Sequence, residues 1–241
     1  MPRVLLDSVV HTDHGILDLL WKEDGYWNGD VERFFAGQVN GLVGASNPHG
    51  VFLYLARMSG GSRVTVLLHD DEPAPDTAAW EDIVEVSSAV PQESLPTWQT
   101  FAGQTTGPLD LGPGSYRLRV SARGRDEARP GRREGESPDD VVDAYLVDAW
   151  LSPEAPDSII QTVSHNAAGR HSLMSGSWDE APGAAAAVAM PVESPTAQPA
   201  VHQPRAGVWA RIWDWIRRTI GEGLLGATSR RPHPATRSDV T

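Results

Sequence analysis

The sequence predicts an all-β fold, because apolar residues alternate with polar ones and because short strand-like runs follow one another closely. The alternation is clearest between Ser115 and Val120, where Tyr116, Leu118 and Val120 share one face of an extended chain. A period of two residues is typical of a strand with one buried face. Similar runs recur, with turn residues and few helical patterns between them. We therefore predict a two-sheet antiparallel β-sandwich or jelly-roll-like domain of about eight to ten strands over residues 1–165.

Individual strands are predicted from runs of β-branched, aromatic and other apolar residues that end at Gly, Pro, Asp or Ser. The clearer candidates, in chain order, are Val4–Val10, Gly15–Trp21, Val51–Met58, Arg63–His69, Trp80–Ser88, Ser115–Val120 and Ala144–Trp150. The weaker candidates are Val39–Val43, Thr97–Phe101 and Ile159–Val163. In the run that begins at Trp80, Asp82 interrupts the apolar face that Val84 and Val86 form. The run Ser59–Ser62, which contains two glycines, predicts a hairpin turn between two of these strands.

The composition changes after the β domain. Residues 166–206 are rich in Ala and Pro and are predicted to be a disordered linker, because such a segment buries too little apolar surface to offset the entropy lost on ordering. Residues 207–222 predict a short amphipathic helix, because apolar and aromatic residues recur there at spacings of three and four. Residues 223–241 are polar and are predicted to be a disordered tail.

Charge is distributed unevenly along the chain, whose formal net charge is −12. Residues 1–160 contain 12 Lys and Arg against 26 Asp and Glu, a net charge of −14, whereas residues 205–241 contain 7 against 3, a net charge of +4. An acidic head repels phosphates, so no direct nucleic-acid binding is expected. It suits a protein partner with a basic surface, whose approach it would accelerate, although solubility alone also explains an acidic surface.

The sequence also bears on the compartment. It contains no cysteine, so neither a disulfide nor a thiolate metal site can form. The first residues lack the apolar core of a signal peptide, and no window has the roughly 18 apolar residues of a membrane-spanning helix. We therefore expect a cytoplasmic protein.

The histidines and acids of the β domain do not form a recognisable catalytic or metal motif. His11 and His14 are three residues apart, so on a strand they would face opposite sides. His49 has only Ser46 as a local nucleophile, and the sequence has no GxSxG elbow. The segment 69–72 is acidic but lacks the ligand spacing of a calcium loop. We predict no catalytic, cofactor or metal residues and no enzymatic activity, with a metal-dependent hydrolase and a carbohydrate-binding jelly roll as lower alternatives.

The helix predicted at 207–222 is a candidate for partner binding. It has three tryptophans within seven residues and several arginines. A helix of this kind could dock in a groove on a protein, lie at a membrane surface, or pack on the chain's own β domain. The partner-binding residues predicted in it are Trp209, Ile212, Trp213, Trp215, Ile216, Arg217 and Arg218.

Two strand-like segments on either side of a long charged loop resemble a known family. The first segment runs from a glycine turn into a strand centred on a tyrosine, at Pro113, Gly114, Tyr116 and Leu118. The second has the pattern Asp-x-Tyr-aliphatic-aliphatic-Asp-Ala, at Asp143, Tyr145, Leu146, Val147, Asp148 and Ala149. This arrangement resembles the competence protein J family, whose members are described as inhibitors of a DNA-entry nuclease.

The resemblance implies a binding protein and not an enzyme. It covers at most residues 10–152, and the sequence departs from the family in its long Arg-rich loop and in everything after Trp150. Asp143 and Asp148 are the best matched acidic positions, and we predict them as partner-binding residues of the β domain.

These observations lead to one main functional prediction and one alternative. We expect a non-enzymatic protein-binding module, an inhibitor or immunity-type protein that acts on a basic partner such as a nuclease, with the C-terminal helix as a second docking element. The alternative is a membrane-surface or assembly adaptor that is targeted by peripheral membrane contact through residues 207–222.

Overall fold

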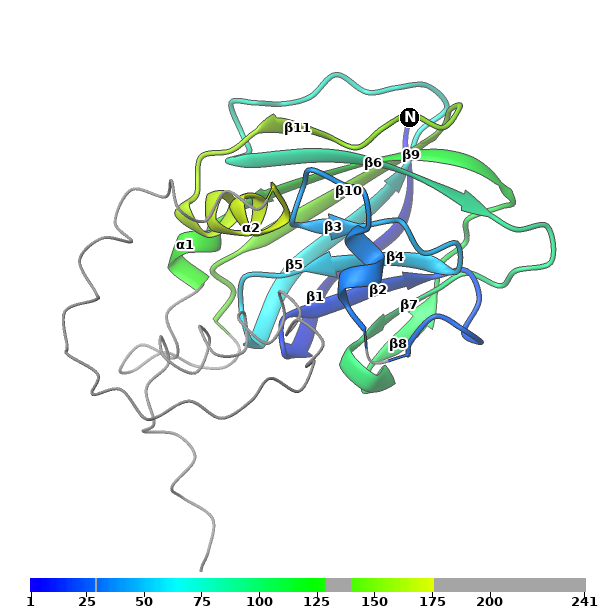
Figure 1. Cartoon of the computed structure of the whole chain (residues 1–241), viewed down its shortest axis with the longest axis horizontal. Coiled ribbons are helices and arrows are strands. Elements are labelled where there is room, and N and C mark those ends of the chain that lie inside the picture. Colours follow the sequence, from blue (N-terminus) through cyan, green and yellow to red (C-terminus); the bar gives the residue numbers. More distant parts are fainter. Residues whose placement is uncertain (29, 129–139, 176–241) are drawn as a thin grey trace, which may run out of the picture. The chain divides into compact units, whose positions relative to one another are not determined.

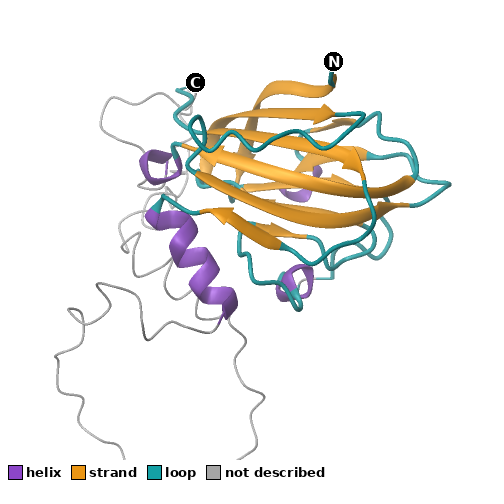
Figure 2. Cartoon of the chain, turned by 90° about the horizontal axis from the view of Figure 1, so that it is seen from above, coloured by secondary structure: helices purple, strands orange, loops and turns teal. Residues whose placement is uncertain are grey.

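The computed structural model describes residues 1–28, 30–128 and 140–175 of the 241-residue chain. All of these residues belong to one compact unit. They form two β-sheets that pack face to face, with short helices at the periphery (Figures 1 and 2). The predicted all-β, two-sheet architecture is therefore confirmed.

The larger sheet has six strands. Their order across the sheet is β1 (Arg3–Asp13), β5 (Ser59–Leu68), β10 (Ala144–Leu151), β9 (Gly114–Arg123), β6 (Asp82–Val90) and β11 (Ser158–Gln161). Neighbouring strands are antiparallel except β5 and β10, which run parallel. The two segments that carry the family resemblance are β9 and β10, and they pair directly with each other.

The smaller sheet has five antiparallel strands. Their order is β3 (Val43–Gly44), β4 (Gly50–Tyr54), β2 (Ile16–Leu20), β7 (Thr97–Thr100) and β8 (Thr106–Pro108). The helical elements of the described residues are short: the 3-10 helices η1 (Glu32–Phe35) and η2 (Phe101–Gly103), and the α-helices α1 (Arg125–Ala128) and α2 (His165–Ser175).

A single apolar core fills the space between the sheets. Alternate residues of the facing strands point into it, as the period-two pattern of the sequence predicts. Its members include Leu17, Leu19, Val51, Leu53, Val64, Val66, Val84, Val86, Leu118, Val120, Tyr145 and Val147. Each fully buried large apolar side chain stabilises the fold by about 1.5–3 kcal/mol, so this core holds the two sheets together.

The structure corrects the hairpin turn predicted at Ser59–Ser62. These residues begin β5, and the chain changes sheet before them, because β4 and β5 belong to different sheets. Gly60 has a φ of +127°, and a Cβ atom on it would lie 2.3 Å from Nε of Arg57. Glycine is therefore needed at this point to admit the Arg57 side chain and a left-handed backbone, and not to close a hairpin.

Helix α2 occupies residues for which a linker was predicted. The Ser164 hydroxyl accepts a 3.0 Å hydrogen bond from the Ala167 N–H, which is an N-cap. The Asp126 carboxylate, from α1, accepts the N–H groups of the first two helical residues at 2.9 and 2.8 Å. This second cap comes from a distant part of the chain, so no local pattern could reveal it. The linker prediction therefore does not hold for residues 166–175.

The rest of the predicted C-terminal organisation lies outside the described residues. This applies to the linker from residue 176 onward, to the amphipathic helix at 207–222, to the tail at 223–241, and to the Arg-rich segment 129–139. Within the described part of the chain, none of the helices combines the length and the apolar character that crossing a bilayer requires.

Candidate functional site

The outer face of the five-stranded sheet carries a row of three side chains. In the register of β2 with its two neighbours, Asp18 lies opposite Phe52 of β4 and opposite Gln99 of β7. Residues opposite each other on neighbouring strands project from the same face of a sheet. Asp18 alternates with the core residues Leu17 and Leu19, so its carboxylate points out of the sandwich.

An aromatic layer covers part of this row. The loop after β2 brings Tyr26 and Trp27 over the sheet, and η1 adds Phe34. The ring centroids of Tyr26 and Phe34 are 4.8 Å apart, and those of Phe34 and Phe52 are 5.1 Å apart. Gly50 permits this close approach, because a Cβ atom there would lie 2.9 Å from the ring of Tyr26. The layer therefore depends on a glycine in the strand beneath it.

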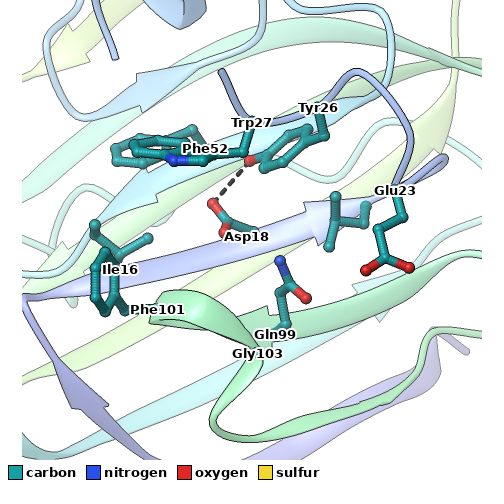
Figure 3. Close-up of a pocket in the computed structure, with 10 residues that line it drawn as sticks. Ile16, Asp18, Glu23, Tyr26, Trp27, Phe52, Gln99, Phe101 and Gly103 are labelled. Atoms are coloured by element: carbon teal, nitrogen blue, oxygen red, sulfur yellow. Dashed lines mark hydrogen bonds between the residues drawn. The ribbon is translucent and has the colours of Figure 1, made fainter. Parts of the chain in front are cut away.

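A pocket of about 280 Å³ opens beside this layer. Figure 3 shows Asp18 in its centre, with Tyr26, Trp27 and Phe52 on one side and Gln99 and Phe101 on the other. Trp27 is 51% exposed, so the pocket wall reaches the surface. The full lining consists of Ile16, Asp18, Leu20, Glu23, Tyr26, Trp27, Phe52, Gln99, Phe101 and Gly103. These residues include two acidic side chains, Asp18 and Glu23, and no Lys, Arg or His.

Asp18 is a buried acid with neutral hydrogen-bond donors. It is 6% exposed, and its Oδ1 accepts a 2.7 Å hydrogen bond from the Tyr26 hydroxyl. Gln99 donates a second side-chain hydrogen bond. Among the described residues, no Lys, Arg or His forms an ion pair with it. Burial raises the pKa of Asp18 to about 6, against the opposing effect of the two hydrogen bonds.

The arrangement favours a cation as the ligand. At neutral pH the pocket holds a negative charge that has lost most of its water and has no positive partner in the described part of the chain, which is a costly state. A cation would compensate that charge and would contact the electron-rich faces of the aromatic rings. An anion would be repelled. No group of three or more His, Asp or Glu side chains suited to a metal ion occurs in residues 1–28, 30–128 and 140–175.

The two acids predicted as partner-binding residues have partners inside the domain. Asp143 is 1% exposed, and its Oδ2 accepts a 2.9 Å hydrogen bond from the Tyr145 hydroxyl. The carboxylate of Asp148 is buried on the other face of β10, where its Oδ1 lies 2.7 Å from Nε2 of His69. Their role in partner binding stays a prediction, to which this geometry adds no support.

The predicted residues of the tail helix are not placed by the structure. Trp209, Ile212, Trp213, Trp215, Ile216, Arg217 and Arg218 all lie outside the described residues. The second docking element and the alternative of a membrane-surface adaptor therefore stay predictions.

Comparison with known proteins gives two structural matches. No protein-family model matches the sequence, and no curated protein matches it significantly. One matching structure is ComJ from Bacillus subtilis, described as an inhibitor of the DNA-degrading activity of NucA, with a TM-score of 0.41 and 14% identity over 63% of this chain and 99% of that one. The other is described as crocagin biosynthetic gene J, with a TM-score of 0.43 and 16% identity over 64% of this chain and 99% of that one.

The fold is ComJ-like. ComJ is a member of the family that the segments β9 and β10 resemble in sequence. The descriptions of ComJ and of the crocagin protein name different functions, and at these identities the likeness concerns the fold alone.

None of the pocket residues is among the site residues predicted from the sequence. Asp18 had a detectable signal, because it is the one charged residue in an otherwise apolar strand, Ile16–Leu20. An acid inside such a run indicates a buried carboxylate that needs partners. Its partners Tyr26 and Gln99 carry no such signal, because strand register and a loop conformation bring them to Asp18.

Proposed function

We propose that this chain is a non-enzymatic protein-binding module that takes a basic protein partner at the outer face of its five-stranded sheet. The observation that supports the proposal is the buried Asp18 carboxylate, which lies in a pocket open to the surface and has only neutral donors among the described residues. A positively charged group of a partner would supply the missing compensation.

The surroundings of the pocket have a charge that suits such a partner. The loop that carries Tyr26 and Trp27 also carries the exposed acids Glu23, Asp24 and Asp30. Residues 1–160 as a whole have a net charge of −14. A field of this sign accelerates the encounter with a basic protein and is screened by salt.

A nuclease is the first partner to test. Nucleases present a basic surface to nucleic acid, and an acidic module that covers this surface would inhibit the enzyme. This is also the class of partner that the sequence resemblance implies.

The test measures association of the full-length chain with a panel of basic nucleases at low and high salt. We expect the association rate to fall as salt rises, and Asp18→Asn to weaken binding by about tenfold or more, since an interfacial charge would lose its partner. The matched control is Asp71→Asn, which removes the same charge from the exposed loop 69–79 next to the six-stranded sheet.

Two results together would contradict the proposed function. If association is insensitive to salt, and if Asp18→Asn and Asp71→Asn both bind as tightly as the unmodified chain, the pocket is not the contact and the proposed function is wrong.

A further inference from the structure

We infer that the group received by the pocket is one arginine side chain of the partner, with its guanidinium between the Asp18 carboxylate and the aromatic wall. The inference deepens the proposed function and rests on it, because it names the chemistry that the pocket selects. Two buried arginines of the same domain, Arg119 and Arg125, are each held by a carboxylate and an aromatic ring. The pocket offers the same two kinds of group.

The first internal example is Arg119 of β9. Its side chain is buried, and its Nε donates a 2.7 Å hydrogen bond to Oε1 of Glu85. Its guanidinium carbon lies 5.1 Å from the centroid of the Trp150 ring. A carboxylate at the edge of the guanidinium and an aromatic ring on its face together hold this buried cation.

The second internal example is Arg125 of α1. It is also buried, with its Nε 3.8 Å from Oδ2 of Asp82 and its guanidinium carbon 5.6 Å from the centroid of the Tyr145 ring. Its Nη1 donates a 2.9 Å hydrogen bond to the Tyr54 carbonyl. An acid, a ring and a neutral acceptor again surround the cation.

The pocket presents the same set of groups without a guanidinium among them. Asp18 supplies the carboxylate, Trp27 supplies an exposed ring, and Gln99 supplies an amide. Two cations lie between β2 and the end of η1. Lys22 is exposed and does not line the pocket. Arg33 donates to the carbonyls of Gly25 and Tyr26 and lies 5.3 Å from the Phe34 centroid, so it is engaged elsewhere.

The size and shape of the pocket favour a single planar cation. A volume of about 280 Å³ lies just below the range of roughly 300–1,000 Å³ that holds drug-sized ligands, so it suits one long side chain. Apolar side chains of Ile16 and Leu20 can contact the aliphatic stem. A guanidinium is flat, weakly hydrated and able to stack on rings, whereas a lysine ammonium is compact and strongly hydrated.

The experiment titrates full-length protein with three capped amino acids and follows the Trp27 and Gln99 side-chain signals by NMR. The probes are N-acetyl-arginine methylamide, the lysine equivalent, and the citrulline equivalent, which has nearly the shape of arginine but no charge. We expect the arginine probe to bind about tenfold or more tightly than the citrulline probe and more tightly than the lysine probe.

Two variants link the signal to the pocket. Asp18→Asn is expected to remove the preference for arginine over citrulline, and Trp27→Leu to weaken arginine binding by several-fold. Asp71→Asn is the matched control and should bind the arginine probe as the unmodified chain does. Equal binding of arginine and citrulline, tighter binding of lysine, or an unchanged preference in Asp18→Asn would overturn the inference.

The inference and the proposed function can fail separately. Selective arginine binding without binding of any basic nuclease would support the pocket chemistry and contradict the proposed function for that class of partner. Nuclease binding that depends on Asp18 without preference for the arginine probe would support the function and contradict the choice of side chain.

Discussion

Asp18 is a residue at which the proposed function and the stability of the domain conflict. The sheet buries its carboxylate, and Tyr26 and Gln99 supply hydrogen bonds that are neutral. A hydrophobic or amide side chain at this position would suit the isolated domain better than a charge does. Positions where a protein retains a destabilising residue are frequently binding sites, because the cost is recovered when the ligand arrives.

The raised pKa of Asp18 predicts how the stability of the domain changes with pH. Its pKa is raised from 3.8 to about 6. The protonated carboxyl therefore contributes to the free energy of unfolding in full below about pH 4, and this contribution is lost as the pH rises through 6. At pH 8 we expect Asp18→Asn to be more stable than the unmodified chain, by up to about 3 kcal/mol. Urea denaturation at pH 8 and pH 4 measures the difference, which should shrink at the lower pH.

The stability of Asp18→Asn is also a control for the binding test. If Asp18→Asn is more stable and yet binds less, unfolding cannot explain the loss. A variant that is less stable at pH 8 would mean that the two hydrogen bonds outweigh the burial of the charge, and it would remove the argument for an uncompensated carboxylate.

His171 of α2 should make the domain sensitive to acid. Its Nδ1 accepts a 3.0 Å hydrogen bond from the Gly41 N–H, which requires that nitrogen to be unprotonated. Burial, assisted by the positive charge of Arg125, lowers the pKa of His171 from 6.5 to about 4, while Asp82 and Asp157 oppose the shift. Its contribution to stability is therefore present above about pH 6.5 and is lost as the pH falls through 4.

The measurement is the free energy of unfolding between pH 7 and pH 4. The contribution of His171 to this change is about 3 kcal/mol, and His171→Asn, which can still accept from Gly41, should remove most of it. His11→Asn, at an exposed histidine, is the matched control. An unchanged pH profile in His171→Asn would show that the helix does not depend on a neutral imidazole.

At the scale of elements, the strand pair β9 and β10 differs from the half-buried strands that its alternation predicts. Tyr116, Leu118 and Val120 do face the core. The opposite face is buried as well, because Arg119 bonds to the carbonyl of Pro73 in the loop after β5 and Arg117 bonds to the carbonyl of Ala155 before β11. The alternation predicted the two faces of β9 correctly, and the segments that cover its polar face keep Arg117 and Arg119 from solvent.

The hydroxyl of Tyr145 in β10 forms hydrogen bonds with three segments of the chain. The Tyr145 hydroxyl accepts from the Ala56 N–H at 2.6 Å and from Nη1 of Arg125 at 3.3 Å, and it donates to Asp143 at 2.9 Å. These bonds use its one donor and both acceptor sites. It connects the segment after β4, helix α1 and the start of β10 in the interior.

We expect Tyr145→Phe to destabilise the domain by about 2–3 kcal/mol, because it leaves a buried N–H and a buried carboxylate without this partner. The control is Tyr116→Phe on the neighbouring strand, where the hydroxyl makes one bond, to the Gly112 carbonyl, and where we expect a loss of about 1 kcal/mol or less. Denaturant midpoints of the two variants give the comparison. Equal losses would show that the interior network contributes no more than a peripheral hydrogen bond.

At the scale of the whole molecule, the two sheets differ in extent. The six-stranded sheet contains five strands of eight or more residues, of which β5, β10, β9 and β6 lie in its interior. The five-stranded sheet has strands of two to five residues. Long, fully paired central strands open only with the whole domain, and short edge strands open locally.

Hydrogen exchange should show this difference directly. We expect the slowest backbone amides in β9 and β10 and much faster exchange in β8 and β11, which are short and lie at sheet edges. Uniform protection across both sheets would indicate that the domain opens as one unit. Exchange in β2 is informative for the site, because stable β2 amides would mean that Asp18 is held on a rigid strand.

Most of the extended segments, the apolar face of a strand such as β9, and the sign of the charge on residues 1–160 could be predicted from the sequence. These properties follow from side chains and their local spacing. Three features needed the folded chain: which strands are neighbours, that β4 and β5 lie in different sheets, and that Asp18, Tyr26, Phe52 and Gln99 line one pocket. The physical reason is that strands pair through backbone N–H and C=O groups, which are alike in every residue, so alternation specifies a face and not a neighbour.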